Sequence, residues 1–158
     1  MRISRVTPSA STNRVSSFFV LILFVAGAAH AQGLGYAIAG PAGTSGFVNT
    51  GTTFHAAGGA EVAGNRVGVG GEFGFFNRLI VGSANGVVRL GHAFVTGGYS
   101  RMGIGDGEGA FSAINFGGGA HIWTSDHVGF RIEFRDHVRT DDRGNTHYWS
   151  IRAGIAFR

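Results

Sequence analysis

The side chains best suited to nucleophilic chemistry in this sequence are histidine and serine, because cysteine is absent. Two groupings near the C-terminus have suitable residue types: His147 with Ser150, and His137 directly after Asp136. Nucleophilic catalysis needs a serine within hydrogen-bonding distance of a histidine that a carboxylate orients. Whether either grouping meets this condition depends on the elements that carry these residues.

Both groupings lie in segments whose side chains alternate between apolar and polar. In 128–139, Phe130, Ile132 and Phe134 fall on one side, and the charged residues between them fall on the other. The segment 147–158 alternates in the same way, and both segments have the length expected of a membrane-spanning β-strand.

The strand assignment argues against catalysis. His147 and Ser150 are three residues apart, so they point to opposite faces and lie about 10 Å apart along a strand at roughly 3.3 Å per residue. His137 and Ser150 belong to neighbouring strands, but Ser150 shares the face of Arg152, which we interpret as the interior. We therefore predict no catalytic residues, and we expect His137 to extend the polar interior.

Metal and cofactor sites are not predicted either. The seven histidines are scattered and lack the spacing of a zinc site. The segment 103–109 contains Asp106 and Glu108 but fits no known calcium-loop spacing, so we interpret it as a solvated loop. The glycine pairs belong to strands and precede no helix that could bind phosphate.

Alternation recurs along the chain and predicts an all-β fold. We expect eight strands, at 34–40, 52–62, 66–76, 79–90, 93–102, 112–123, 128–139 and 147–158. The faces of 93–102 cannot be assigned, and Gly97-Gly98 could form a bulge there. A soluble sandwich would also alternate, with its aromatic residues inside and its charges in water.

The lengths of the connections favour a barrel over a sandwich. Three links are short, at 63–65, 91–92 and 124–127, and three are longer and polar or glycine-rich, at 41–51, 103–111 and 140–146. The link near Asn77-Arg78 breaks this pattern because it is also short. Short turns at one end and long loops at the other are typical of an antiparallel outer-membrane barrel with both termini in the periplasm. We therefore predict an eight-stranded antiparallel transmembrane up-and-down β-barrel.

The faces opposite the aromatic residues carry charges that must pair if they fill the interior. An eight-stranded barrel is just wide enough for side chains to fill it, and an unpaired buried ion is costly. We predict a lumen ion network of five arginines and three glutamates: Glu61, Arg66, Glu72, Arg89, Arg131, Glu133, Arg135 and Arg152. Such a network would plug the lumen; the alternative interpretation of the same charges is a narrow ion-selective pore.

The N-terminus has the pattern of a secretory signal peptide. Residues 1–17 are basic and polar, 18–29 form an apolar run, and Ala29-His30-Ala31 matches a cleavage site. We predict a signal peptide at 1–31 and a barrel domain at 32–158. Without the first 31 residues, 10 Arg face 9 Asp plus Glu, so the sequence pI near 10.6 does not indicate a nucleic-acid partner.

These features together resemble the small bacterial outer-membrane barrels of the OmpA/OmpX-like class. The segment 116–137, FGGGAHIWTSDHVGFRIEFRDH, is similar to the penultimate hairpin of that class. The resemblance implies a monomer in the outer membrane, with membrane lipid and the barrel-assembly machinery as partners. That machinery reads a C-terminal aromatic residue on the last strand; here Phe157 is penultimate.

We accordingly expect a non-enzymatic protein with a structural or surface-interaction role through its extracellular loops and with no cofactor. Tyr36, Phe75, Trp149 and Phe157 are candidates for the aromatic girdles at the membrane interfaces. The alternatives are a lipid-modifying barrel enzyme of the acyl-hydrolase type, a narrow pore, and a secreted soluble glycine-rich β-protein.

Overall fold

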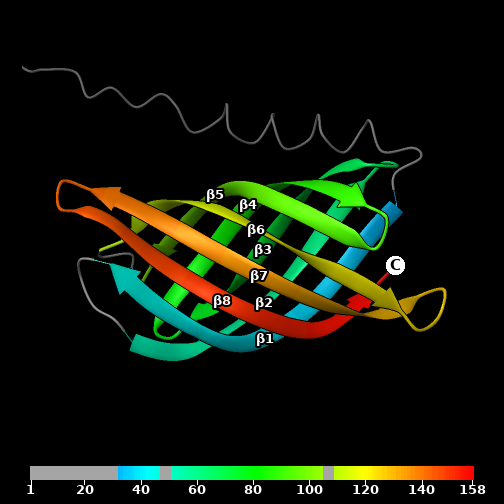
Figure 1. The fold of residues 1–158 in the computed structure, drawn as a ribbon, viewed down its shortest axis with the longest axis horizontal. Coiled ribbons are helices and arrows are strands. Elements are labelled where there is room, and N and C mark those ends of the chain that lie inside the picture. The colour runs from blue at the N-terminus through cyan, green and yellow to red at the C-terminus, as the bar shows by residue number, and fades with distance from the viewer. Residues whose placement is uncertain (1–31, 47–50, 105–108) are drawn as a thin grey trace, which may run out of the picture. The chain divides into compact units, whose positions relative to one another are not determined.

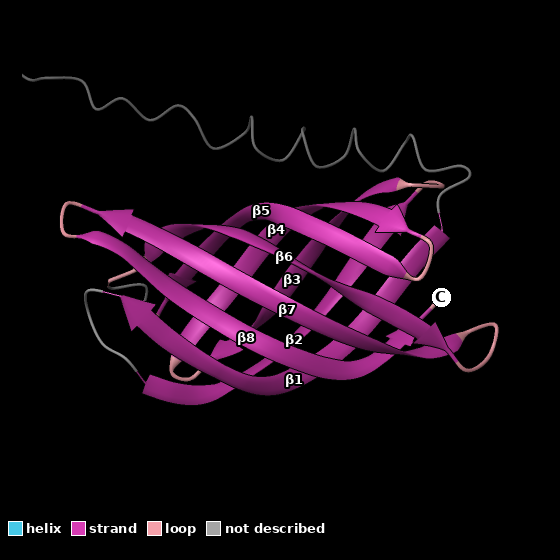
Figure 2. Cartoon of the chain, in the orientation of Figure 1, coloured by secondary structure: helices cyan, strands magenta, loops and turns pink. Residues whose placement is uncertain are grey.

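The structure, a computed structural model, describes residues 32–46, 51–104 and 109–158. The predicted signal peptide at 1–31 lies outside these residues. The described chain folds into eight strands joined by turns (Figures 1 and 2). They are β1 (Gln32–Gly46), β2 (Gly51–Ala63), β3 (Val67–Phe76), β4 (Leu79–Leu90), β5 (Ala93–Gly103), β6 (Phe111–Trp123), β7 (Val128–Asp141) and β8 (Gly144–Phe157). Over these residues, no helix is long and apolar enough to cross a membrane.

The strands form one closed antiparallel barrel in sequence order. Each strand pairs with its neighbours in the chain, and β8 returns to β1, so that the first and last strands lie side by side (Figure 1). This pairing runs from Gly35↔Phe157 to Gly46↔Thr146 and is interrupted at Gly40 and Pro41. Closure gives every strand two partners and leaves no open edge. This satisfies the backbone hydrogen-bonding groups within the sheet, as a structure surrounded by lipid requires.

All eight predicted strands are confirmed, but several are longer than expected. β1 continues through Pro41 to Gly46, and β7 and β8 pair as far as Asp141↔Gly144. The loop predictions at 41–51 and 140–146 are therefore wrong for 41–46, 51, 140–141 and 144–146, whereas 142–143 do form a turn. Residues 47–50 lie outside those that the structure describes. Gly144 has a φ of 122°, which allows the tight turn between β7 and β8. The predicted bulge at Gly97-Gly98 is also wrong, because pairing on both sides of β5 is uninterrupted there.

The barrel has an apolar outer wall and a polar interior. Phe54, Phe73, Phe130, Ile132 and Phe134 are between 44% and 57% exposed and point outward. The charged residues between them on the strands are almost completely buried. A soluble β-protein buries its aromatic residues and rarely exposes so continuous an apolar surface. The fold is therefore that of a transmembrane barrel, with its hydrocarbon-facing side outward.

We call the end of the barrel with Gly33 and Phe157 the terminal end, and the opposite end the loop end. At the loop end, an apolar cluster fills the lumen: Ala42, Phe76, Val81, Met102 and Ala113. At the terminal end, Leu34, Tyr36, Ile38 and Ala156 form a second cluster. The buried charges lie between these two clusters, in the middle of the lumen.

Candidate functional site: the ion network of the lumen

Glu133 on β7 is the centre of the lumen network. Its carboxylate accepts hydrogen bonds from the Nε atoms of Arg131 (2.8 Å) and Arg135 (2.6 Å) and from Nη2 of Arg152 (2.9 Å). All four side chains are at most 1% exposed. Arginine suits this arrangement because its planar guanidinium offers several donors in a fixed geometry. A single carboxylate thus links three buried guanidinium groups.

Glu72 on β3 binds the same network from the other side of the lumen. Arg152 donates to it from Nη1 (2.7 Å) and Nη2 (3.1 Å), which makes a bidentate pair. The hydroxyl of Tyr36 donates to Oε2 at 3.0 Å, and Arg135 lies 3.9 Å from the same oxygen. Gly59 faces the Tyr36 ring, and any side chain at Gly59 would collide with it. The glycine therefore makes room for the ring that reaches Glu72.

Arg131 connects the network to the terminal end. Its Nη1 donates to Glu61 at 2.7 Å, and its guanidinium lies between the rings of Tyr36 (4.0 Å) and Phe94 (4.1 Å). Such stacking on ring faces stabilises a cation that has been removed from water. Arg89 reaches the other oxygen of Glu61 at a distance of 3.6 Å. Seven of the eight predicted residues are thereby brought into one cluster.

Arg66 is the exception, and its assignment to the lumen is wrong. The residue is exposed and lies in the turn before β3 begins at Val67. It shares the alternation of Glu72, but the β2–β3 ladder starts only at Ala63↔Gly68. Alternation fixes a side chain's direction only where the strand is paired, so the side chain of Arg66 does not enter the lumen. Its carbonyl oxygen accepts a hydrogen bond from the backbone of Arg89 (2.7 Å).

Tyr36 is also wrongly assigned, because it points into the lumen and not to a membrane interface. It is 6% exposed, whereas the girdle candidates Phe75 and Phe157 are 54% and 49% exposed and face outward. Trp149 lies on the outer face as well, with its ring against Gly43.

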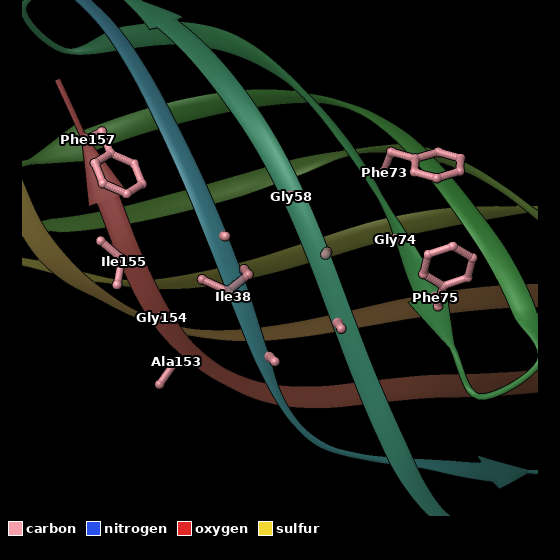
Figure 3. A pocket seen from close by; sticks show the side chains of 13 residues that line it. Ile38, Gly58, Phe73, Gly74, Phe75, Ala153, Gly154, Ile155 and Phe157 are labelled. Carbon is pink, nitrogen blue, oxygen red and sulfur yellow. The ribbon is translucent and has the colours of Figure 1, made fainter.

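The outward side of β1 explains the error at Tyr36. Alanine and glycine from β1, β2 and β8 line a hollow of about 600 Å³ on the outer wall, and Phe73, Phe75, Ile155 and Phe157 are also part of its lining (Figure 3). On β1 itself, the outward positions hold only small residues such as Ala37 and Ala39. The large apolar residues of β1 consequently face inward, opposite to those of most other strands.

Two histidine–serine pairs lie in the lumen towards the loop end. Nδ1 of His55 lies 3.2 Å from the hydroxyl of Ser150, and Nδ1 of His137 lies 2.9 Å from that of Ser100. All four residues are 0% exposed. The sequence predicted that His137 extends the polar interior, but it could not show which residues meet, because each pair joins strands that are not neighbours. His147 and Ser150 do point to opposite faces, as predicted.

A third polar pair was also missed, and it lies on the outer wall. Nδ1 of His147 lies 2.7 Å from Oδ2 of Asp136, and Asp136 is only 7% exposed. The two residues sit on β7 and β8, where Asp136 pairs with Trp149 and His147 with Val138. The alternation of the sequence places them on the apolar face, but nothing in the sequence indicates that they meet.

The described residues contain no group of three or more histidine and carboxylate side chains that could hold a metal ion. Asp106 and Glu108, from the segment interpreted as a solvated loop, lie outside the residues that the structure describes.

The fold and the filled, charged lumen define the class of an eight-stranded transmembrane β-barrel. No family model matches the chain, and no curated protein matches it. Among solved structures it is similar to Neisserial surface protein A, with 13% identity over 80% of this chain and 97% of that one and a TM-score of 0.60. It is also similar to the N-terminal β-barrel domain of Pseudomonas aeruginosa OprF, with 14% identity over 81% and 98% of the two chains and a TM-score of 0.58.

The predicted OmpA/OmpX-like resemblance is thus confirmed as a likeness of fold. A de novo designed transmembrane β-barrel matches with 17% identity over 79% of this chain and 93% of that one, at a TM-score of 0.53. A fold that a designed sequence can adopt does not by itself specify a biological activity. Function has to be argued from the residues of this chain.

Proposed function

We propose that this chain is an outer-membrane β-barrel protein with a plugged lumen and a structural or surface-interaction role, and that it is not an enzyme. The observation that carries the proposal is the contrast between the two sides of the wall. The outer face is apolar and the inner face is filled by buried ion pairs, so the barrel is stable only with lipid outside and its own side chains inside.

The packing of the lumen supports the plug. Arg131, Arg135 and Arg152 converge on Glu133 at 2.5–2.9 Å, and no more than 1% of any of their side chains is exposed. The apolar cluster at the loop end, which includes Phe76 and Met102, lies between these charges and the solvent. An ion entering the lumen would have to displace paired guanidinium groups, which is costly in a region with little water. We therefore favour the plug over the narrow pore.

The positions of the histidines support a non-enzymatic role. Both histidine–serine pairs of the lumen are fully buried and face away from the lipid. On the outer wall, His147 hydrogen-bonds Asp136, and among the described residues its side chain bonds no serine. Ser45 is its cross-strand neighbour on β1, so an acyl hydrolase at the wall would have to use this residue as its nucleophile.

The proposed partners follow from the same architecture. The apolar wall contacts membrane lipid, and the barrel-assembly machinery would recognise β8, which ends at Phe157. A closed sheet leaves no strand edge for pairing with another copy, which favours a monomer. Nucleic acid is not an expected partner. At the loop end, the described surface available for interaction comprises the turns at 77–78 and 142–143, whereas 47–50 and 105–108 lie outside the residues that the structure describes.

The proposal is tested on the mature chain, expressed with its leader and purified from membranes. We expect N-terminal sequencing to begin at Gln32, recovery in the outer-membrane fraction, and a gel mobility that changes on boiling. In planar bilayers, the wild type should show no steady conductance under conditions in which a large porin does. Stable channel openings would contradict the plug, and release of fatty acid from lipid that is lost in His147→Ala or Ser45→Ala would contradict the non-enzymatic role.

A further inference from the structure

The buried charges of the lumen do not balance. Four arginines of the described residues face three glutamates there. Three of the arginines hold carboxylate oxygens at 2.9 Å or less, but Arg89 comes no closer than 3.6 Å to Glu61. The other oxygen of Glu61 is already bound by Arg131 at 2.7 Å. The excess positive charge of the network is therefore located at Arg89, at the terminal end.

The guanidinium of Arg89 lines a small cavity and has unused donors. Its side chain is 18% exposed, and its Nη1 atom makes no hydrogen bond among the described residues. Its Nε and Nη2 atoms are buried away from the cavity, and Nη2 faces Oε2 of Glu61 at 3.6 Å. The cavity has a volume of about 110 Å³ and is lined by Gly33, Leu34, Arg89, Gly91, His121, Trp123 and Arg158. A donor that has no protein partner and faces a polar cavity is satisfied by water or by a bound group.

The other side chains around the cavity add positive charge and hydrogen-bond donors. The guanidinium of Arg158 lies 4.2 Å from the ring centroid of Trp123, and its Nε donates to the carbonyl oxygen of Asp126 at 2.8 Å. The ring of His121 stacks on that of Trp123, and its Nε2 lies 3.0 Å from Nη1 of Arg131. Arginine can only donate, so His121 accepts with Nε2 and carries its proton on Nδ1. No aspartate or glutamate is among the described residues that line the cavity.

We infer that this cavity is a binding site for a small oxyanion, either a carboxylate or a phosphate group, held by Arg89 and Arg158. The Nη1 atom of Arg89 donates to one oxygen of such a group, and the guanidinium of Arg158 supplies further donors. The cavity is large enough for more than one water and therefore for a compact group such as acetate or phosphate. A bound anion would neutralise the excess charge of the network. The site goes beyond the proposed function and does not depend on it.

The test uses the folded chain in detergent with Trp123 as the reporter, in a Trp149→Phe background that removes the other tryptophan. Phosphate and acetate are titrated against chloride at constant ionic strength. We expect a saturable change in Trp123 fluorescence with phosphate or acetate, and the stronger of the two identifies the preferred group. Arg89→Gln should weaken binding at least tenfold, and Arg158→Gln should weaken it less. Arg139→Gln, at the loop end, is the matched control and should bind as the wild type does.

Two results would overturn the inference. One is an equal response to chloride, which would show only screening of charge. The other is unchanged binding in Arg89→Gln. If Arg89→Gln does not fold, the test uses Arg158→Gln. Arg158 lies at the exposed mouth of the cavity, so this variant should fold. We expect phosphate to raise its thermal unfolding midpoint less than that of the wild type, and an equal rise would overturn the inference. None of these outcomes affects the bilayer and gel-mobility tests of the proposed function.

Discussion

Ile132 and Glu133 are consecutive residues of β7 with opposite surroundings. Ile132 is 48% exposed on the outer wall, where it would contact lipid, whereas Glu133 is 1% exposed and binds three arginines. A shift of one residue in the register would exchange the two positions. The pair shows that the barrel is specified by the difference between its two faces and not by the hydrophobicity of either one.

The two faces also differ in how many residues each position depends on. On the wall, any apolar side chain of suitable size can replace another, and the hollow around Ala37 and Ala39 shows that even small residues are accepted. In the lumen, each charge depends on partners from several strands, because Arg152 on β8 joins Glu72 on β3 to Glu133 on β7. A substitution in the lumen should therefore affect the whole network, whereas one on the wall should act locally.

The largest effect is expected for Glu133→Gln. The change keeps the shape of the side chain but removes the negative charge on which Arg131, Arg135 and Arg152 converge. Loss of one member of a buried ion pair typically costs roughly 3–5 kcal/mol. The free energy of unfolding, measured by urea titration of the barrel in lipid vesicles, should fall by about this amount. A loss below 1 kcal/mol would mean that the arginines are hydrated and that the lumen is open.

A smaller but still large effect is expected for Ile132→Arg. A charge on the lipid-facing side near the middle of the membrane costs roughly 2–4 kcal/mol, and less towards the interfaces. The same urea titration measures it, with Ile132→Leu as the control that keeps the position apolar and should change little. If Ile132→Arg were tolerated while the barrel remained soluble without detergent, the outer wall would not be in contact with lipid.

Most of the barrel could be predicted from the sequence, because alternation is a local signal that each strand carries by itself. It was sufficient to find all eight strands and to place seven residues of the ion network in the lumen. It failed where a strand's outward residues are too small to mark a face, as on β1, and where Arg66 continues the alternation beyond the end of pairing. It also gave no faces for β5, where Phe94, Thr96 and Met102 turn out to be inside.

The pairs that cross the lumen could not have been predicted. His55 and Ser150 are 95 residues apart, and His137 and Ser100 are 37 apart, on strands that are not adjacent. Their meeting depends on the tilt and stagger of the closed barrel, which no single strand encodes. The excess charge at Arg89 has the same origin, because it becomes visible only when the distances between partners are known.

Tyr36→Phe should have the smallest effect of the three, and it separates the position predicted from the sequence from the one in the structure. On the wall, loss of the hydroxyl would be neutral or favourable, because phenylalanine is the more apolar residue. In the lumen, the hydroxyl donates to Oε2 of Glu72 at 3.0 Å. A hydrogen bond to a charged group contributes about 1.5 kcal/mol or somewhat more, and Arg152 still binds that oxygen in the variant, so we expect a loss of about 1.5 kcal/mol in the urea titration. The aromatic ring that stacks on Arg131 is unchanged. Tyr99→Phe is the matched control, because Tyr99 is 54% exposed on the outer wall and its hydroxyl bonds, among the described residues, only the nearby Ser112. The stability of this variant should remain within about 0.5 kcal/mol of the wild type. Equal effects of the two substitutions would place Tyr36 on the wall and would detach Glu72 from this part of the network.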